Sequence, residues 1–431
     1  MRPAALAKRL LTADSTAMAG PDDTVITAPR GAAFGFIFAS AVASALSIGV
    51  MVPVLPSLLK LLVGGDSASA AEWNVVFATA GGLMSLFAGP ILGLMADRWG
   101  RRPVLLLSLT GMGLDFLLMA FAPNLAWLFV GRLISGATSG LFSVANAYVA
   151  DVTPLENRAK AFGWMGAAFS VGFLAGPAIG GLLGQINLRL PFMVAAALTL
   201  ANVLYGLLVL PESLPLERRV ARFDLKKANP MGSLKLLRSR PGLGRLAAIY
   251  FLNQLSQMIW PAIFVLYTGY RYGWSPGVVG VTMMGGSLIG VGVQGLVVGP
   301  VIRRFGERGA LLIGAIVSVF GFAWYGFAPS AVYYWAVMPI TAFANLLIPG
   351  LQGLMSRSVG PGEQGQLQGA NQSLMGLASV IGPSLFGLSF AWAVRHASAH
   401  AVGLPMFIAA AIMLACLALA WAPAGSAKAE A

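Results

Sequence analysis

Long apolar runs separated by short polar connectors fill the chain after residue 33. A bilayer core about 30 Å thick is crossed by roughly 20 apolar residues in a helix. By this measure the sequence predicts an all-α membrane protein with 12 transmembrane helices. These spans are 34–58, 74–96, 103–122, 126–150, 161–184, 191–211, 246–269, 275–299, 309–328, 331–355, 367–393 and 402–422.

A basic stretch at 212–245 divides the spans six and six. We therefore predict an N-terminal tail at 1–32, a six-helix bundle at 33–211, a linker at 212–245, a second six-helix bundle at 246–422 and a C-terminal tail at 423–431. The first tail contains no continuous apolar core of signal-peptide length, so we expect it to be retained.

The two predicted bundles repeat each other with an offset of 206 residues. The offset relates Gly93 to Gly299, Gly100 to Gly306, and Gly176-Pro177 to Gly382-Pro383. Parallel six-span repeats are typical of transporters that bind substrate between their halves and expose it alternately to each side of the membrane. This pattern predicts a transporter.

Composition supports a membrane protein, because 58% of residues are hydrophobic and 10% are charged, against about 25% charged residues in soluble domains. The net charge of +13 would suggest nucleic acid in a soluble chain. Here, however, 23 basic residues fall on one set of connectors and tails and four on the other. The positive-inside rule then places both termini in the cytoplasm, and we expect no nucleic-acid partner.

Residues for enzymatic or metal chemistry are scarce. Cys416 is the only cysteine, and both histidines, His396 and His400, fall in one connector. No span carries a histidine, and no glycine-rich phosphate loop is present. We expect no enzyme, no cofactor and no metal site.

Two charged residues lie deep in the predicted spans, Asp115 in span 3 and Arg132 in span 4. A helical rise of 1.5 Å per residue puts them at nearly the same depth. A charge at the bilayer centre costs about 2.5–3.5 kcal/mol on insertion scales. The pair is either a permanent structural ion pair or a proton-coupling site, in which Asp115 gains and loses a proton and Arg132 lowers its proton affinity.

The connector after span 2 reads Gly93-Leu-Met-Ala-Asp97-Arg98-Trp-Gly100-Arg101-Arg102-Pro103. It is a tight turn that could serve only as a solvated basic loop, but it closely resembles the signature of the major facilitator superfamily. That resemblance implies the superfamily fold and a cytoplasmic gate of Asp97, Arg98, Arg101, Arg102, Asp151 and Arg158. It also implies that Asp97, Arg101 and Arg158 form a latch at the start of span 11 in the outward-open state.

Span 5 carries a glycine motif of Gly172, Gly176, Pro177, Gly180 and Gly181. It is similar to the motif of proton-driven antiporters in the superfamily, although glycines on one helix face also serve plain close packing. Met51-Val-Pro-Val-Leu-Pro56, Leu210-Pro-Glu-Ser213, Arg304-Phe-Gly-Glu-Arg308 and Gly365-Gln-Leu-Gln-Gly369 resemble the tetracycline-efflux branch of 12-span drug:H⁺ antiporters. That branch usually has acids in spans 1 and 9, where this chain has Ser44 and Ser318.

Amide side chains gather in the second half, where they could bind substrate or simply hold helices together. With one aromatic residue they form the predicted substrate-binding set: Asn253, Gln254, Gln257, Trp260, Gln294, Asn345, Gln352, Asn371 and Gln372. Tyr267 lies nearby in the sequence. Such a cavity suits amphiphilic, planar substrates that are neutral, zwitterionic or singly charged.

The sequence therefore predicts a secondary active transporter that exports amphiphilic drugs or tetracycline-like molecules in exchange for protons. The alternative is a facilitator or proton-coupled transporter of an endogenous metabolite or sugar. The resemblance implies a monomer in the bacterial inner membrane, with a small-molecule substrate, protons and membrane lipid as its partners.

Overall fold

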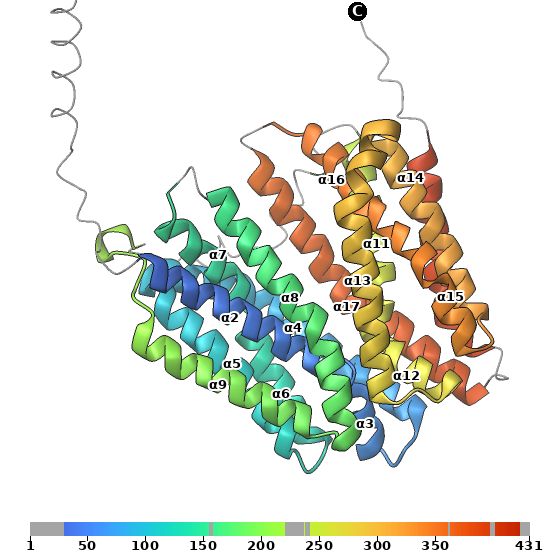
Figure 1. Cartoon of the computed structure of the whole chain (residues 1–431), viewed down its shortest axis with the longest axis horizontal. Coiled ribbons are helices and arrows are strands. Elements are labelled where there is room, and N and C mark those ends of the chain that lie inside the picture. The colour runs from blue at the N-terminus through green and yellow to red at the C-terminus, as the bar shows by residue number, and fades with distance from the viewer. Residues whose placement is uncertain are drawn as a thin grey trace, which may run out of the picture.

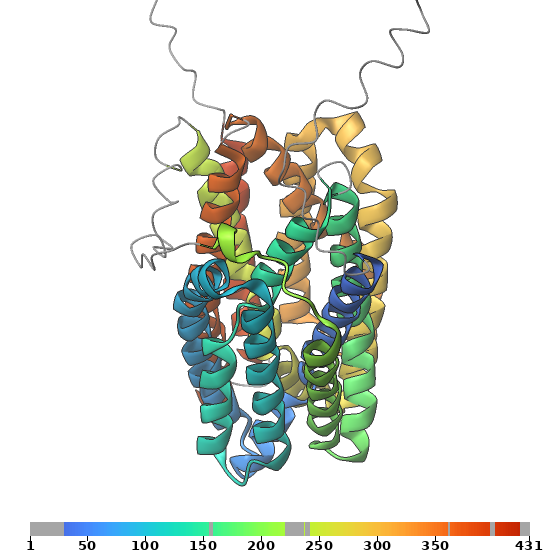
Figure 2. The same cartoon turned by 90° about the vertical axis from the view of Figure 1, so that its left-hand side faces the viewer.

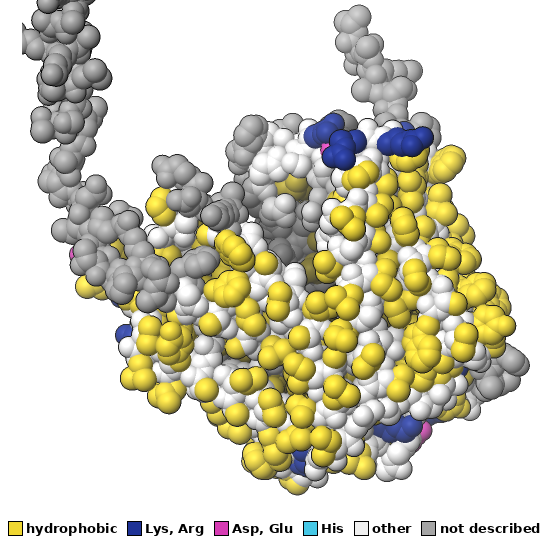
Figure 3. All heavy atoms as spheres, viewed as in Figure 1, with side chains coloured by type: hydrophobic (Ala, Val, Ile, Leu, Met, Phe, Trp, Pro, Cys, Tyr) yellow, Lys and Arg dark blue, Asp and Glu magenta, His cyan; other side chains and the backbone are white. Residues whose placement is uncertain are grey.

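The computed structural model describes residues 30–154, 158–219, 237, 242–360, 363–396 and 401–422. The regular elements of these residues are helices, and 12 of the segments they form are long and apolar enough to cross a membrane. The prediction of an all-α protein with 12 spans is confirmed. Large hydrophobic side chains cover the flank in Figure 3, as expected for a surface that faces lipid.

The first half contains six spans, shown in blue to green in Figures 1 and 2. Its helices are α2 (Arg30–Met51), α3 (Leu55–Leu62), α4 (Ser67–Trp99), α5 (Arg101–Phe121), α6 (Leu125–Ala137), α7 (Leu141–Val152), α8 (Arg158–Ile186) and α9 (Leu190–Val209). Helices α2 and α3 together make span 1, and α6 and α7 make span 4. A 3-10 turn, Leu216–Arg218, follows α9.

The second half also contains six spans, shown in yellow to red in Figure 1. Its helices are α11 (Leu243–Gln257), α12 (Ile259–Tyr272), α13 (Pro276–Leu296), α14 (Val298–Phe327), α15 (Ala331–Thr341), α16 (Leu347–Arg357), α17 (Gln364–His396) and α18 (Leu404–Trp421). A 3-10 segment, Ala342–Leu346, joins α15 to α16 within span 10, and another, Ala401–Gly403, precedes α18.

Local sequence explains where several helices break or begin. Span 1 breaks after Met51, because Pro53 and Pro56 interrupt the helical hydrogen bonds. Span 2 begins at Ser67, earlier than predicted, because Asp66 caps it by accepting hydrogen bonds from the N–H groups of Ala68 and Ser69. Hydrogen bonds from the side chain and backbone of Ser69 also lower the pKa of the Asp66 carboxyl.

The structure preserves the landmarks of the internal repeat. Gly100 and Gly306 both have positive φ, 107° and 71°, at the equivalent turns between spans 2 and 3 and between spans 8 and 9. These backbone conformations favour glycine. Pro177 and Pro383 likewise lie inside α8 and α17. The sequence offset therefore corresponds to equivalent positions in the two halves.

The glycine motif lets α8 pack directly against α2. A Cβ at Gly172 would lie 2.6 Å from the Val42 carbonyl oxygen, and one at Gly176 would lie 2.6 Å from the Cα of Gly49. Gly181 faces the second half instead, where it lies against Pro276 of α13. The predicted close approach is therefore present, within the first half and between the halves.

Replacing Gly176 with Leu should destabilise the protein by about 1–3 kcal/mol, because backbone atoms of α2 leave no room for a side chain. The thermal transition of the purified protein in detergent measures the effect. Gly163→Leu on the same helix is the matched control, since no atom lies within 4 Å of a Cβ built at Gly163. Equal transitions for the two variants would contradict this account of the motif.

The two halves meet at one end of the molecule. Because the number of spans is even, α2 begins and α18 ends at the same end, called the termini end below; the opposite end is the far end. Near the far end, Asn74 donates to the Ala262 carbonyl at 2.7 Å, and Gln185 donates to the Ser275 hydroxyl at 2.9 Å. Arg395 forms an ion pair with Glu72 there.

Toward the termini end the halves separate. Along the α17-facing side of α4, a Cβ at Gly82 would lie 3.5 Å from the Ser379 carbonyl oxygen, whereas Gly89 and Gly93 have nothing within 4 Å. Helices α8 and α13 diverge in the same direction in Figure 1, and Figure 3 shows the surface hollowed between the halves at its upper edge. The structure is therefore open at the termini end and closed at the far end.

Candidate functional site

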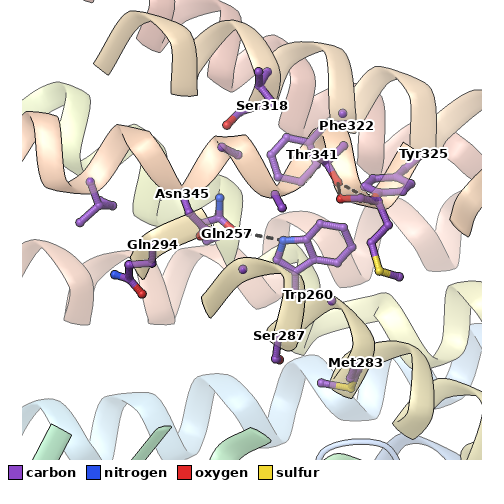
Figure 4. Close-up of a pocket in the computed structure, with 18 of the residues that line it drawn as sticks. Gln257, Trp260, Met283, Ser287, Gln294, Ser318, Phe322, Tyr325, Thr341 and Asn345 are labelled. Atoms are coloured by element: carbon purple, nitrogen blue, oxygen red, sulfur yellow. Dashed lines mark hydrogen bonds between the residues drawn. The ribbon is translucent and has the colours of Figure 1, made fainter. Parts of the chain in front are cut away.

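A cavity of about 720 Å³ lies within the second half of the molecule. Helices α11 to α16 supply its walls, and Phe173 of α8 is the residue that the first half contributes. Figure 4 shows the side chains converging from these helices. This volume falls within the range of small-molecule sites, which are largely apolar with a few orienting polar groups.

Trp260 occupies the centre of the aromatic wall. Its ring stacks on Phe322 with centroids 5.7 Å apart and an interplanar angle of 29°, and meets Tyr325 edge-on at 5.7 Å. Its indole N–H donates to the Gln257 side-chain oxygen at 3.1 Å, drawn as a dashed line in Figure 4. This contact fixes the ring plane and leaves the Gln257 amide N–H₂ group available as a donor.

Six of the nine predicted substrate-binding residues line this cavity: Asn253, Gln254, Gln257, Trp260, Gln294 and Asn345. Asn253 donates to the Gln254 side-chain oxygen at 3.3 Å, so these neighbours are already connected. The amides therefore come from three spans and converge as predicted.

The other three predicted residues do not line the cavity. Asn345 and Gln352 are seven residues apart, but the 3-10 segment Ala342–Leu346 changes the helical register between them. Asn371 is buried on α17, and its neighbour Gln372 is exposed on another face of that helix. Tyr267 also lies elsewhere, fully buried with its hydroxyl donating to the Tyr325 carbonyl.

The sequence analysis did not assign several of the wall residues to the cavity. Ser318, Phe322 and Tyr325 form one face of α14 and line the cavity. Residues four and seven positions after Ser318 lie on the same face of the helix. Helical spacing from Ser318 could therefore have placed Phe322 and Tyr325 in the cavity wall. Thr341 lines the cavity as well and forms a 2.7 Å hydrogen bond with the Tyr325 hydroxyl.

Ser44 and Ser318, the two serines singled out in the sequence analysis, lie in different environments. Ser318 is in the cavity wall, where its hydroxyl donates to the Gly314 carbonyl at 2.8 Å. Ser44 is buried in the first half, 1% exposed. Among the described residues that line the cavity, none carries a charge. The wall therefore offers hydrogen bonds and aromatic faces to a ligand.

Asp115 and Arg132 form an ion pair between α5 and α6. The Nε of Arg132 donates to Asp115 Oδ1 at 3.2 Å, and its Nη2 contacts Oδ2. Asp115 is 1% exposed and Arg132 15%. Gly131 permits the approach, because a Cβ there would lie 2.7 Å from Asp115 Oδ1. Asp115 and Arg132 are therefore paired, as the sequence predicted, and they lie in the first half, away from the cavity wall.

The gate residues form a charged cluster at the termini end of the first half. Arg101 binds Asp97 at 2.5 Å and Asp151 at 3.2 Å. Arg102 donates instead to the Leu207 carbonyl at 2.7 Å, and Arg98 lies on the last turn of α4. The side chain of Arg158 lies outside the described residues. Within the described part of the gate, Arg101 pairs with both Asp97 and Asp151. The latch of Asp97, Arg101 and Arg158 at the start of span 11 stays a prediction.

Glu212 holds this cluster in place from beyond α9. Its carboxylate accepts hydrogen bonds from the backbone N–H groups of Arg101 and Arg102 at 2.7 and 3.2 Å. A carboxylate at the N-terminus of a helix stabilises the helix dipole and satisfies free donors. The Leu210-Pro-Glu-Ser213 stretch contained this residue, but its role depends on a contact that sequence spacing does not reveal.

Among the described residues, no group of three or more His, Cys, Asp or Glu side chains could hold a metal ion. The site thus consists of two separate parts. A neutral aromatic and amide cavity lies in the second half, and a buried ion pair with a charged cluster lies in the first.

Comparison with known proteins shows which family this chain resembles. Residues 37–383 match the family model described as the Major Facilitator Superfamily. The chain is 37% identical to the class C tetracycline resistance protein of Escherichia coli, over 86% of this chain and 92% of that protein. It is 38% identical to the class E protein of Escherichia coli, over 80% and 85%.

A solved structure shares the fold at low sequence identity. The inward-facing, unoccupied structure of a bacterial homologue of the human lysosomal transporter Spinster matches with a TM-score of 0.74 and 15% identity, over 91% of this chain and 96% of that one. The family match over most of the chain and the relatives above identify the protein as a member of the Major Facilitator Superfamily.

Proposed function

We propose that the protein is a proton-coupled efflux transporter of amphiphilic, planar small molecules, tetracycline-like compounds among them. The observation that carries this proposal is the separation of the uncharged substrate cavity from the buried Asp115–Arg132 pair. The similarity to tetracycline resistance proteins supports drug export over the metabolite or sugar alternative.

In this mechanism the substrate enters from the cytoplasm through the termini end. The excess of basic residues on that side supports a cytoplasmic location for both termini in a bacterial inner membrane. Trp260 and Phe322 stack against the planar substrate, and the amides of Gln257 and Asn345 orient it. A neutral wall accepts a neutral, zwitterionic or singly charged molecule without burying an unpaired protein charge.

Proton exchange takes place at Asp115. When its carboxylate is ionised, Arg132 compensates the charge; protonation removes that attraction and lets the helices of the first half rearrange. Opening of the far end releases substrate and admits the proton, and the return step delivers the proton to the cytoplasm. The gate cluster acts in this cycle at the cytoplasmic mouth. The glycine motif acts in it along the contact between α2 and α8. We expect the monomer to complete this cycle, with lipid around its apolar flanks.

Everted membrane vesicles test the proposal. Because their cytoplasmic face is outside, a proton gradient that is acidic inside the vesicle should drive tetracycline into the lumen as protons leave, and an uncoupler should abolish this accumulation. A panel of planar amphiphilic dyes extends the test to other substrates. Substrate-induced alkalinisation of the lumen measures proton release directly. Accumulation that ignores the uncoupler, or a response to sugars alone, would overturn the efflux assignment.

A further inference from the structure

The charged clusters at the termini ends of the two halves have opposite signs at repeat-equivalent positions. The 206-residue offset relates Asp97, Arg101 and Asp151 of the first half to Arg303, Glu307 and Arg357 of the second. The ion pair between Arg101 and Asp151 therefore has a counterpart between Glu307 and Arg357, with the charges exchanged. Because the repeat keeps the positions of these charges and inverts their sign, a charged residue of one half can attract its counterpart in the other half.

In the open structure each cluster is paired within its own half. Asp97 binds Arg101 at 2.5 Å, and Arg357 binds Glu307 at 2.9 Å. The Asp97 side chain is 41% exposed and that of Arg357 is 77% exposed, whereas their partners are each 13% exposed. The outer member of each pair is thus accessible to another partner, while the inner member stays anchored.

The packing of α4 against α17 shows which groups meet when the termini end closes. The two helices are antiparallel, and Thr79 contacts Ser384, Gly82 faces Ser379, and Leu86 faces Gly376. In each facing pair the two residue numbers add up to 461–463, which defines the register of the two antiparallel helices. Extending this register toward the termini end places Asp97 level with residues 364–366, where α17 begins at Gln364.

Arg357 is held beside that point. The side-chain N–H₂ of Gln364 donates to the Ser356 carbonyl at 2.9 Å, and the Ser356 hydroxyl donates to the Gln364 side-chain oxygen at 3.2 Å. These two bonds tie the end of α16 to the start of α17. Arg357 is the last residue of α16 and therefore lies next to the connector that Asp97 approaches.

The charge on this connector also favours Arg357 as the partner. Glu363 directly precedes α17, and its carboxylate accepts the Gly360 N–H at 2.9 Å. An approaching Asp97 is thus attracted by the N-terminus of α17 but repelled by the Glu363 carboxylate. Arg357 is the only Lys or Arg between Arg308 and Arg395 in the sequence. If position 357 were acidic, as Asp151 is, the connector would repel Asp97.

We infer that Arg357 exchanges partners during transport, leaving Glu307 and binding Asp97 across the mouth when the termini end closes. This inference rests on the alternating access proposed above and adds a residue that determines the balance between the two states. Glu307 holds Arg357 in the open state, and Asp97 holds it in the closed state. The sign inversion between the repeats makes the second contact attractive.

Accessibility of a single cysteine tests the exchange. Gly89 continues the α17-facing side of α4 beyond Leu86 and has no neighbour within 4 Å in the open state. With Cys416, the chain's only cysteine, replaced by Ala, Gly89→Cys provides one reporter thiol. Everted vesicles are treated with a membrane-impermeant maleimide, and the labelling rate reports how often this side of α4 is open.

The two partners of Arg357 should shift labelling in opposite directions. Arg357→Gln and Asp97→Asn should each raise the rate by about two- to fivefold, the range expected for loss of one exposed ion pair. Glu307→Gln should lower it, because Arg357 is then released toward Asp97. Arg357→Lys should retain the wild-type rate. The Asp97→Asn/Arg357→Gln double variant should match the single variants, since both lose the same contact.

Equal directions for Glu307→Gln and Arg357→Gln, or additive effects in the double variant, would overturn the exchange. Membrane abundance and the thermal transition of each variant identify one that fails to fold, and Arg357→Lys then carries the comparison with Glu307→Gln. The labelling needs neither substrate nor a proton gradient. Its failure would therefore leave proton-coupled efflux standing, and failure of efflux would leave the labelling result intact.

Discussion

Asp115→Asn is expected to abolish proton-driven export while the protein still inserts into the membrane. Asparagine keeps the size of the side chain but cannot exchange a proton. It also leaves Arg132 without its buried counter-charge, and breaking a buried pair by removing one partner costs about 3–5 kcal/mol. Export against a pH gradient in everted vesicles, normalised to the amount of protein in the membrane, measures the loss.

A double variant distinguishes a proton carrier from a structural ion pair. Asp115→Asn with Arg132→Gln removes both charges, so no unpaired charge remains in the first half. If the pair only holds α5 and α6 together, this variant should recover both the thermal transition and transport. We expect it to recover stability without proton-coupled export. Restored export, or normal gradient dependence in Asp115→Asn alone, would remove Asp115 from the coupling mechanism.

Trp260→Ala is expected to raise the half-saturation concentration for substrate by about tenfold or more. The indole stacks on Phe322, meets Phe264 and Tyr325 edge-on, and orients Gln257 through its N–H. Aromatic pairs contribute about 0.5–1.5 kcal/mol beyond the area they bury, and 1.4 kcal/mol corresponds to tenfold in affinity. Concentration dependence of transport, together with direct binding to the purified protein, gives the shift.

Trp260→Phe and Trp392→Ala provide the matched comparisons. Phenylalanine keeps the stacking surface but loses the N–H donor, so its effect should be intermediate. Trp392 is 54% exposed on α17 and does not line the cavity, and its removal should leave the half-saturation concentration unchanged. An unaltered concentration dependence in Trp260→Ala would show that substrate binds outside this cavity.

Periodicity and charge placement predicted much of the architecture. The length of each apolar run gave the 12 spans, and the positions of Gly100 and Gly306 gave the equivalent turns, because positive φ leaves a clear glycine signal. Asp115 and Arg132 could be paired from the sequence because a charge deep in a span needs a partner, and the helical rise put both at one depth.

Other parts of the site depend on information that local sequence does not carry. The position of Gln352 could not be derived from helical spacing, because the preceding 3-10 segment is specified by packing around residues 342–346. The contact of Glu212 with the start of α5 joins segments 111 residues apart. The closed far end likewise depends on contacts between residues far apart in the sequence, such as Asn74 with the Ala262 carbonyl.

The one-sided position of the cavity has an evolutionary consequence. Its walls come from six helices of the second half, while the ion pair belongs to the first, and Phe173 is the side chain of the first half that reaches the cavity. In the proposed mechanism, substitutions that reshape the walls therefore leave the coupling pair in place. Under that mechanism, selection by a new toxic compound can change the range of exported molecules through the second half alone, without altering the residues that exchange the proton.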